Sequence, residues 1–232
     1  MQSTRLSKAT TKALNKTARY SSAQSGAINY SLGLRTSKHP LRTTLENYIA
    51  VRYARHHKAV IEHFMPNLLV LEEGLQTRAA LGLNSARNQA LFLECYLDKP
   101  VEQAISQQLC TPVDRSKVVE IGNLAASQKS ASHLLFTLLS ALLDQAGYRW
   151  IVFTATPCVQ TMVENMGFSL QAISDAKAEC INASENWGSY YENRPQVMVG
   201  CIDDAMRKAL SPAMRAELTH HSKAISDIAA TV

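Results

Sequence analysis

The chain has 232 residues, of which 46% are apolar and 19% are charged, and its formal net charge is +5. This length suits one domain with a small appendage, and the apolar content excludes an intrinsically disordered chain. The five cysteines are odd in number and form no CxxC pair, which indicates reduced thiols in a cytoplasmic protein. No stretch approaches the ~18 apolar residues that a membrane-spanning helix requires.

The positive charge is concentrated at the N-terminus. Eight Lys and Arg precede Glu46 and no acidic residue does, whereas the rest of the chain has 16 basic and 19 acidic residues. Residues 1–26 lack the apolar run of a secretory signal peptide, and we expect them to form a disordered basic arm. Such an arm can also attract an acidic carrier protein, a nucleic acid or an anionic lipid, although no pattern indicates specific nucleic-acid recognition.

The first half of the chain predicts two strands that form a hairpin, preceded by a strand and a helix. Gly74-Leu75 separates two short apolar runs, as in an antiparallel hairpin. Pro40 and Pro66 bracket the long helical pattern. The predicted strands are 28–35, 67–73 and 76–83, and the predicted helices are 41–64, 91–96 and 100–109.

The stretch 118–168 is predicted to form a strand, a loop, a helix, a second strand and a second helix, in that order. Leucines at helical spacing between Leu134 and Leu143 form a wide apolar stripe, and Gly147 ends that helix. The run 150–154 is nearly all apolar, as in a strand covered on both faces. Thr156-Pro157 begins the next helix. The loop 125–130, at the first strand–helix junction, is a natural site for an anion because helical N–H groups point outward there.

The end of the chain predicts two more strands and a helical extension. The strands are 169–173 and 196–202, with a polar, irregular region between them. Residues 203–232 read as helices divided near Ser211-Pro212. Because the early hairpin forces antiparallel neighbours, we predict a mixed, mostly antiparallel α/β (α+β) sheet flanked by helices, formed by residues 27–202, and not a doubly wound nucleotide fold.

Glu120 is the first candidate for a functional residue. It stands between Val119 and Ile121 in an apolar strand whose end leads into the anion-binding loop. A half-buried carboxylate there has a raised pKa and can act as a general base. The alternative is a Glu that faces outward from the strand, because alternation alone does not say which face is buried.

Two further candidates follow. Small residues from Ser127 to Ser132 let a phosphate approach the backbone, with Lys129 adding charge; the alternative is a helix N-cap at Ser130 or Ser132. In the cluster Trp187-Gly188-Ser189-Tyr190-Tyr191, a tyrosine hydroxyl could protonate a leaving group; the alternative is a packing cluster. His56, His57 and His63 have no partners at zinc-ligand spacing, so no metal is expected. Cys158 in a first helical turn is read as a packing residue rather than a nucleophile.

The order of elements resembles the GNAT acyltransferase fold, and longer stretches resemble the bacterial thermostable haemolysin family. The fold resemblance rests on a polar loop and helix after a central strand and on a helix that ends in Gly167-Phe168. The stretches that carry the family resemblance are HPLRTTLENYIAVRY, FMPNLLVLEEG, QTRAALGLNSAR, LFLECYLDKPVEQAIS, VDRSKVVEIGNLAA, YRWIVFTATP and WGSYYENRPQVMVG.

The resemblance implies a V-shaped splay between the strands at 118–124 and 150–154 that receives the pantetheine of an acyl-CoA or acyl-carrier-protein donor. It implies that Glu120 deprotonates a small amine acceptor and that Tyr190 or Tyr191 protonates the leaving thiolate. The residues implied to hold the donor are Asn123, Leu124, Ala125, Gln128, Lys129, Ser130, Ala131 and Ser132. The loop lacks the glycines of the usual GNAT phosphate loop, so a carrier-protein donor, held partly by its own surface, would depend less on it.

Two alternatives to an N-acyltransferase stay open. The family name suggests a membrane-lytic protein, although eight cations with few apolar anchors give only reversible association with lipid. A non-catalytic module that binds acyl-CoA would fit the missing glycines.

Overall fold

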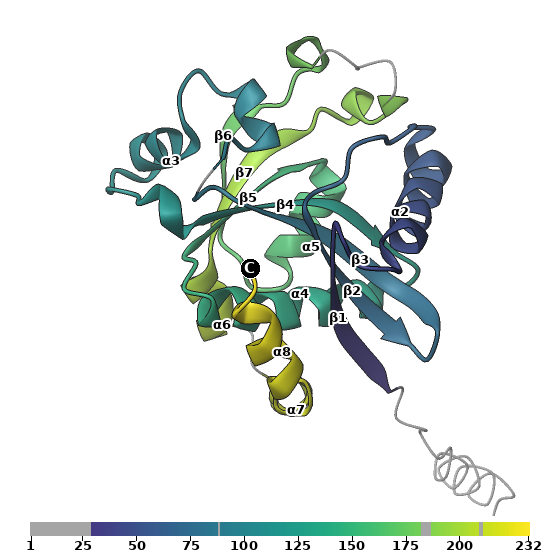
Figure 1. Ribbon diagram of the computed structural model, residues 1–232. Helices are drawn as coiled ribbons and strands as arrows, with labels where there is room; N and C mark the ends of the chain where they lie inside the picture. The colour runs from purple at the N-terminus through teal and green to yellow at the C-terminus, as the bar shows by residue number, and fades with distance from the viewer. Residues whose placement is uncertain (1–28, 88, 182–186, 209–210) are drawn as a thin grey trace, which may run out of the picture.

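The computed structural model describes residues 29–87, 89–181, 187–208 and 211–232, which Figure 1 draws as a coloured ribbon. The predicted basic arm, residues 1–26, lies outside these ranges. The described part contains a seven-stranded sheet in the order β1-β2-β3-β4-β5-β7-β6. Its strands are β1 (Tyr30–Thr36), β2 (Asn67–Glu73), β3 (Gln76–Ser85), β4 (Val118–Ala126), β5 (Trp150–Ala155), β6 (Leu170–Asp175) and β7 (Gln196–Cys201).

Helices cover both faces of the sheet, as predicted. The α-helices are α2 (Arg42–His57), α3 (Val101–Leu109), α4 (Lys129–Gln145), α5 (Pro157–Glu164), α6 (Ile202–Lys208), α7 (Pro212–His220) and α8 (Ser222–Ala229). The 3₁₀ helices used below are η1 (Phe92–Tyr96), η2 (Arg115–Lys117) and η5 (Tyr191–Asn193). In Figure 1, α2 lies on one side of the sheet and α4 and α8 lie on the other.

β4 and β5 form the parallel pair of an otherwise antiparallel sheet. Their pairing runs only from Val118 opposite Trp150 to Glu120 opposite Val152, although β4 continues to Ala126 and β5 to Ala155. The two strands therefore diverge beyond Glu120, which confirms the predicted splay. Backbone groups on the facing edges beyond this point do not pair with the neighbouring strand and can meet another molecule.

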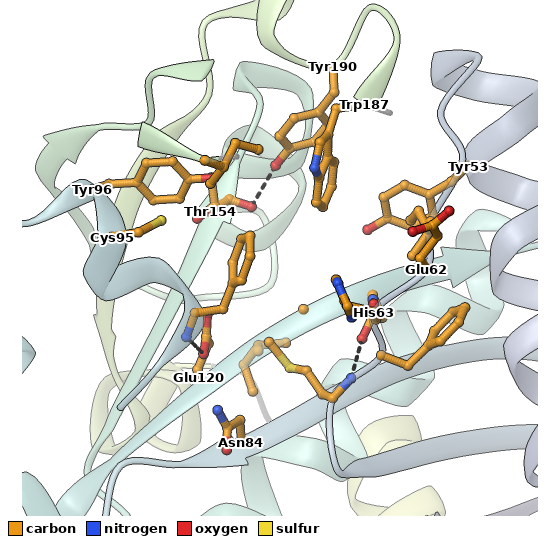
Figure 2. Close-up of a pocket in the computed structure, with 18 of the residues that line it drawn as sticks. Tyr53, Glu62, His63, Asn84, Cys95, Tyr96, Glu120, Thr154, Trp187 and Tyr190 are labelled. Atoms are coloured by element: carbon orange, nitrogen blue, oxygen red, sulfur yellow. Dashed lines mark hydrogen bonds between the residues drawn. The ribbon is translucent and has the colours of Figure 1, made fainter. Parts of the chain in front are cut away.

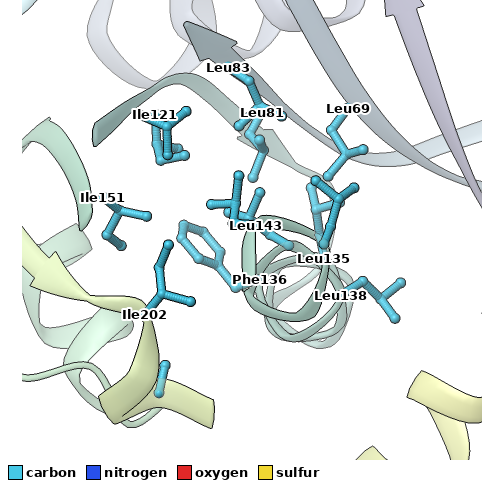
Figure 3. Packing of buried hydrophobic residues seen from close by; sticks show 14 of the residues in the cluster. Leu69, Leu81, Leu83, Ile121, Leu135, Phe136, Leu138, Leu143, Ile151 and Ile202 are labelled. Atoms are coloured by element: carbon cyan, nitrogen blue, oxygen red, sulfur yellow. The ribbon is translucent and has the colours of Figure 1, made fainter. Parts of the chain in front are cut away.

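The main core lies between one face of the sheet and α4. Figure 3 shows Leu135, Leu138 and Leu143 of this helix among side chains of β2, β3, β4 and β5. The leucine stripe read from the sequence is therefore the buried face of α4, because its spacing keeps these side chains on one side. Ile225 and Ile228 of α8 join the same cluster, so the C-terminal helices pack onto the core of the sheet domain.

The opposite face of the sheet carries two separate apolar clusters. One lies under α2 and contains Leu45, Ile49 and Ala125; the other lies under η1 and α3 and contains Val118 and Val152. Because side chains alternate along a strand, Glu120 and Gly122 point to the same face as Val118. The carboxylate thus lies in the interval between the two clusters.

Three local predictions differ from the structure. The helix predicted at 41–64 ends at His57, because Lys58 takes a left-handed conformation (φ 55°) and its N–H bonds to the Ala54 carbonyl. The segment 91–96 forms the 3₁₀ helix η1 rather than an α-helix. β4 extends to Ala126 and α4 begins at Lys129, so the loop predicted at 125–130 shrinks to two residues, and the N-cap is Gln128 rather than Ser130 or Ser132.

Candidate active site

A pocket of about 500 Å³ lies over β4 where it diverges from β5. Its floor is the stretch Glu120–Asn123, and Thr154 of β5 lies at its back. The segment 60–66 forms one wall, and η1 together with Trp187–Tyr191 forms the other. Figure 2 shows these side chains converging from segments that are far apart in sequence. The pocket therefore occupies the interval between the two apolar clusters.

Glu120 is almost completely buried at this floor, with 2% of its surface exposed. Its two carboxylate oxygens each accept a backbone N–H at 2.9 Å, from Phe92 and Leu93 at the start of η1. Burial raises the pKa of Glu120 to about 7, and the two backbone hydrogen bonds partly oppose that rise. The alternative of a Glu that faces outward from the strand is excluded, because the carboxylate is buried, anchors η1 and lines the pocket.

Asn123 creates a β-bulge in the pocket floor. It has a left-handed backbone (φ 49°), and the register with β3 shifts there. Its side-chain oxygen accepts the N–H of Met65 at 2.9 Å. The Met65 side chain fills the space left by glycines, since a Cβ on Gly122 would lie 2.5 Å from its methyl carbon and one on Gly82 would lie 2.7 Å from its Cβ. The bulge thus fixes the wall segment above the strand.

Arg42 fixes the other end of this wall. Its buried guanidinium donates to the carbonyl oxygens of Met65 (2.6 Å) and Pro66 (3.0 Å) and to that of Arg35 at the end of β1 (2.9 Å). Glu46, one turn along α2, accepts a bond from its Nε at 2.6 Å. Because one side chain holds three carbonyl groups from two segments, residues 58–66 leave the helical path and cross the sheet instead.

The predicted tyrosines both line the pocket but have different partners. The Tyr190 hydroxyl donates to the Thr154 carbonyl at 3.1 Å, and burial raises the pKa of Tyr190 well above its usual value. The Tyr191 hydroxyl shares a hydrogen bond of 2.5 Å with the hydroxyl of Tyr96, and burial raises the pKa of both residues. Tyr191 is half-buried, so its hydroxyl is the better placed of the two predicted residues to meet a ligand.

The aromatic segment that carries these tyrosines docks on the end of α2. Ser189 donates its backbone N–H to the carbonyl of His57 at 2.8 Å, and Gly188 takes a left-handed conformation (φ 52°) against Lys58. The His57 ring packs edge-on against Tyr190 with centroids 5.3 Å apart. The pocket is therefore closed by contacts between residues more than 100 positions apart in the chain.

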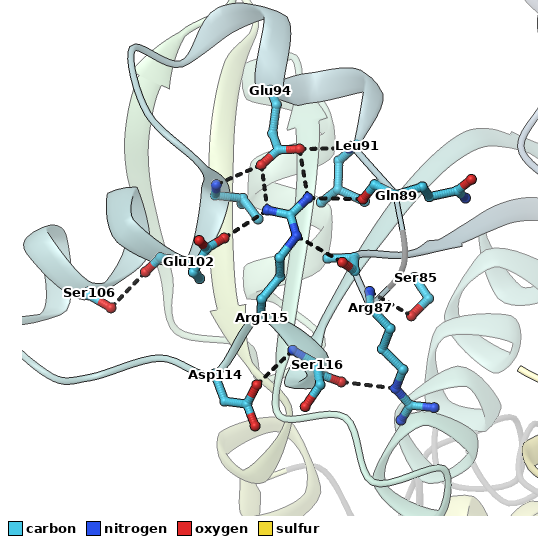
Figure 4. A network of polar contacts seen from close by, with 12 residues as sticks. Ser85, Arg87, Gln89, Leu91, Glu94, Glu102, Ser106, Asp114, Arg115 and Ser116 are labelled. Carbon is cyan, nitrogen blue, oxygen red and sulfur yellow. Dashed lines mark hydrogen bonds and ion pairs between the residues drawn. The ribbon is translucent and has the colours of Figure 1, made fainter.

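A polar network supports η1 from the other side, as Figure 4 shows. Arg115 of η2 binds both oxygens of Glu94, at 2.7 and 2.9 Å, and reaches Glu102 of α3 at 2.7 Å. Glu94 also accepts the N–H groups of Leu91 and Val101. The Arg115 guanidinium and these bonds lower the pKa of Glu94 to about 2. The network fixes the turn whose N–H groups hold Glu120.

We expect Arg115→Gln to lower the free energy of unfolding by about 2 kcal/mol at neutral pH, because Glu94 loses a bidentate charged partner. Since the pKa of Glu94 is depressed from 4.5 to about 2, this stabilisation is complete above pH 4.5 and is lost as the pH falls towards 2. Urea unfolding of both proteins between pH 3 and 7 measures it. A difference that stays constant below pH 4 would contradict the assignment.

The residues predicted to hold the donor lie along one path from the pocket to the start of α4. Asn123 lines the pocket, whereas Leu124 packs towards the main core and its N–H bonds to the Tyr53 hydroxyl. Ala125 is buried under α2. The other five predicted donor-binding residues also lie outside the pocket lining. Gln128, Lys129 and Ser130 are exposed, and Ala131 and Ser132 are buried. Their part in donor binding stays a prediction.

Sequence reasoning missed the wall segment and two polar residues. The sequence predicts a helix for residues 60–64, although Glu62 and His63 line the pocket. Asn84 lies opposite Glu120 in the β3–β4 register and is 8% exposed. A polar side chain between Leu83 and Ser85 in an apolar strand was the available signal. Tyr53, whose pKa burial raises to about 12, gave no signal beyond its helical position.

Within the described residues, no three His, Cys, Asp or Glu side chains are grouped so as to hold a metal ion. His63 has left the helix that carries His56 and His57. Among the same residues, no helix combines the length and apolar character needed to cross a bilayer.

The fold is that of GNAT-like acyltransferases, as comparisons with solved structures indicate. FeeM, an N-acyl amino acid synthase from uncultured soil microbes, aligns with a TM-score of 0.54 at 16% identity, over 78% of this chain and 97% of FeeM. BjaI, a CoA-dependent acyl-homoserine lactone synthase solved with SAM and isopentyl-CoA, aligns with a TM-score of 0.52 at 10% identity, over 83% and 89%. The AHL synthase LasI aligns with a TM-score of 0.50 at 9% identity, over 75% and 89%.

The family can be stated more narrowly than the fold. Residues 35–206 match the model of the family described as Thermostable hemolysin, which is most of the chain. The chain belongs to this family, and the resemblance read from the sequence is confirmed. No curated protein matches it in sequence.

Proposed function

We propose that the protein is an N-acyltransferase that moves an acyl group from a thioester of CoA or of an acyl carrier protein to an amine. The observation that carries this proposal is the pocket at the β4–β5 divergence with the buried carboxylate of Glu120 in its floor. Three structural neighbours named as N-acyl amino acid or acyl-homoserine lactone synthases, one solved with an acyl-CoA, support an acyl donor.

In the proposed reaction, the amine nitrogen attacks the thioester carbonyl carbon, a C–N bond forms and the C–S bond breaks. Glu120 takes the proton that the nitrogen loses. A pKa of about 7 leaves much of this carboxylate ionised at neutral pH, and its acidity still lies close to the operating range of a general base. A carboxylate has about four lone-pair sites, and in Glu120 two of them accept the backbone N–H groups of η1. The others can accept a proton or a further hydrogen bond.

The departing sulfur takes a proton from the Tyr191–Tyr96 pair. Burial raises the pKa of Tyr191 further above neutral than is usual for a tyrosine, so the hydroxyl stays protonated, as a donor requires. Tyr190 acts differently in this proposal, because its hydroxyl is committed to the carbonyl of Thr154. It shapes the pocket at the end of β5.

We expect Tyr191→Phe to lower kcat at least about tenfold with little change in stability. Tyr190→Phe should instead lower the free energy of unfolding by about 1 kcal/mol, because the Thr154 carbonyl loses its partner. Steady-state kinetics and urea unfolding of both variants separate the two roles. Full turnover in Tyr191→Phe together with lost turnover in Tyr190→Phe would show that Tyr190, and not Tyr191, is the proton donor.

The test of the proposed function is thiol release. Purified protein is mixed with octanoyl-CoA or octanoyl-acyl carrier protein and with a panel of primary amines, and free thiol and acylated amine are measured together. Equal amounts of thiol and amide are expected with at least one donor. Absence of both products and of donor binding across the panel would exclude an acyltransferase.

The start of α4 is the expected position of the donor phosphates. Gln128 gives no side-chain cap, and Lys129 and Ser130 are exposed there. Lys129→Ala is therefore expected to raise KM for octanoyl-CoA several-fold without changing kcat. This rise corresponds to a loss of about 1 kcal/mol or less in the binding free energy of the donor. An unchanged KM for both donors would place the phosphates elsewhere.

A further inference from the structure

Among the described residues, the carboxylates that line the pocket face no Lys or Arg. Glu120 forms its floor and Glu62 stands on the wall segment, whereas the described lining contains no Lys or Arg. The one imidazole of the described lining belongs to His63. Glu62 is exposed and makes no ion pair with any described residue. Both carboxylates thus face the pocket without a Lys or Arg of the described residues to neutralise them.

Aromatic rings enclose the space between these two carboxylates. Trp187 lies 5.4 Å from Tyr190 and 6.2 Å from Phe92, measured between ring centroids. Figure 2 shows Tyr53 and Glu62 on one side of the pocket and Glu120 on the other, with Trp187 above. The arginines that stack on rings in the described part of the chain use Tyr48, Tyr148 and Trp150, none of which lines the pocket. The pocket rings are therefore free to meet a cation from a ligand.

This combination discriminates between classes of amine. A carboxylate entering the pocket would lose water and meet two like charges, with no described Arg or Lys to bind it. An ammonium would gain two carboxylates and several ring faces. We therefore expect amino acids to bind this pocket poorly, although the neighbour FeeM is named as an N-acyl amino acid synthase.

We propose that the acceptor is a diamine-like cation without a carboxylate, whose reacting nitrogen lies at Glu120 and whose second ammonium lies at Glu62. This inference rests on the proposed acyl transfer, and it specifies the substrate class of the same site. A fully aliphatic diamine fits the apolar and aromatic walls between the two acidic positions.

Three compounds test separately the effect of a carboxylate and the effect of a second ammonium on the ligand. Cadaverine and lysine differ only in the carboxylate, and cadaverine and pentylamine differ only in the second ammonium. Their binding is measured by calorimetry on the full chain, and their acylation is measured with octanoyl-CoA and octanoyl-acyl carrier protein. Cadaverine is expected to bind at least about tenfold more tightly than lysine and to be acylated with the higher kcat/KM.

Two variants test whether the second ammonium lies at Glu62. In Glu62→Gln, the preference for cadaverine over pentylamine should shrink about fivefold through KM, with kcat unchanged. Glu164→Gln, an exposed carboxylate on α5 outside the pocket lining, is the matched control and should keep the preference. Circular dichroism confirms that both variants fold.

The outcomes separate this inference from the proposed function. Lysine binding as tightly as cadaverine, or acylated as well, would overturn the inference while leaving acyl transfer intact. Failure of cadaverine to bind at 10 mM, a concentration about ten times a typical upper KM, would also overturn it. Cadaverine binding that excludes lysine, without thiol release from either donor, would support the ligand class and count against acyl transfer.

Discussion

Replacing Glu120 by glutamine is expected to lower kcat/KM for amine acylation by about 10²- to 10³-fold, because the pocket loses its proton acceptor. In the unmodified protein, kcat/KM should rise with pH and level off above about 7, where the carboxylate is ionised. The loss in Glu120→Gln should shrink above pH 10, where a larger fraction of the amine is already neutral. A pH-independent rate in the unmodified protein would contradict a base at this position.

The same carboxylate also holds η1, so a structural effect must be separated from a chemical one. Glutamine keeps the size of the side chain but has one acceptor oxygen, which costs about 1–3 kcal/mol at a buried pair of N–H donors. Glu94→Gln is the matched control, because Glu94 holds the same turn and does not line the pocket. It should lose stability with less than about a fivefold loss of kcat/KM. Equal losses of activity in both variants would assign Glu120 a purely structural role.

Burial of Glu120 also has a consequence for stability. Its pKa is about 7 in the folded protein and 4.5 when it is exposed, so the folded state keeps the proton over a range where the unfolded state has released it. The free energy of unfolding therefore falls as the pH rises from about 4.5 to about 7. This pH-dependent part should be absent in Glu120→Gln, which unfolding experiments at pH 5 and pH 8 measure.

Gly188→Ala is expected to destabilise the protein by about 2–4 kcal/mol and to open the pocket. An added Cβ would collide with the carbonyl oxygen of His57 and lie 2.7 Å from that of Lys58, and the backbone is left-handed there. The segment from Trp187 to Tyr191 then leaves the end of α2, because the clash is with backbone that cannot turn away. Urea unfolding and the fluorescence of Trp187 measure the two effects.

Gly74→Ala provides the control for the backbone conformation. Gly74 has a similar φ of 59°, but nothing lies within 4 Å of the position of its Cβ. It should cost only about 1–2 kcal/mol, the conformational penalty of a non-glycine residue, and keep the pocket intact. If the two variants lose the same stability and the same activity, contact with α2 does not hold the aromatic segment.

Most of the fold could be predicted from the sequence because its signals are local. The apolar stripe on α4 and the hairpin around Gly74-Leu75 are set by residues close together in the chain. The helix predicted for residues 58–64 is wrong because the path of the segment 58–66 depends on distant groups. Arg42 binds its carbonyls and Asn123 binds the Met65 N–H, and neither contact leaves a periodic trace in the segment itself.

The candidate site divides in the same way. Glu120, Tyr190 and Tyr191 could be singled out because polar or aromatic residues interrupt a local pattern, and all three line one pocket. Glu62 and Asn84 could not be singled out, since an isolated Glu or Asn has many possible positions. The β3–β4 register places Asn84 in the pocket, and the wall segment that crosses the sheet places Glu62 there.

The sequence by itself determined the elements, the order in which they follow one another and the presence of a carboxylate in the central strand, because these depend on short-range periodicity and turn chemistry. Only the tertiary structure decided at which residue β4 and β5 separate, that the carboxylate faces the interval between two apolar clusters and that acidic and aromatic groups line it without a described Lys or Arg. Which face of a strand is buried, and what covers it, depends on contacts between distant segments that no local pattern records.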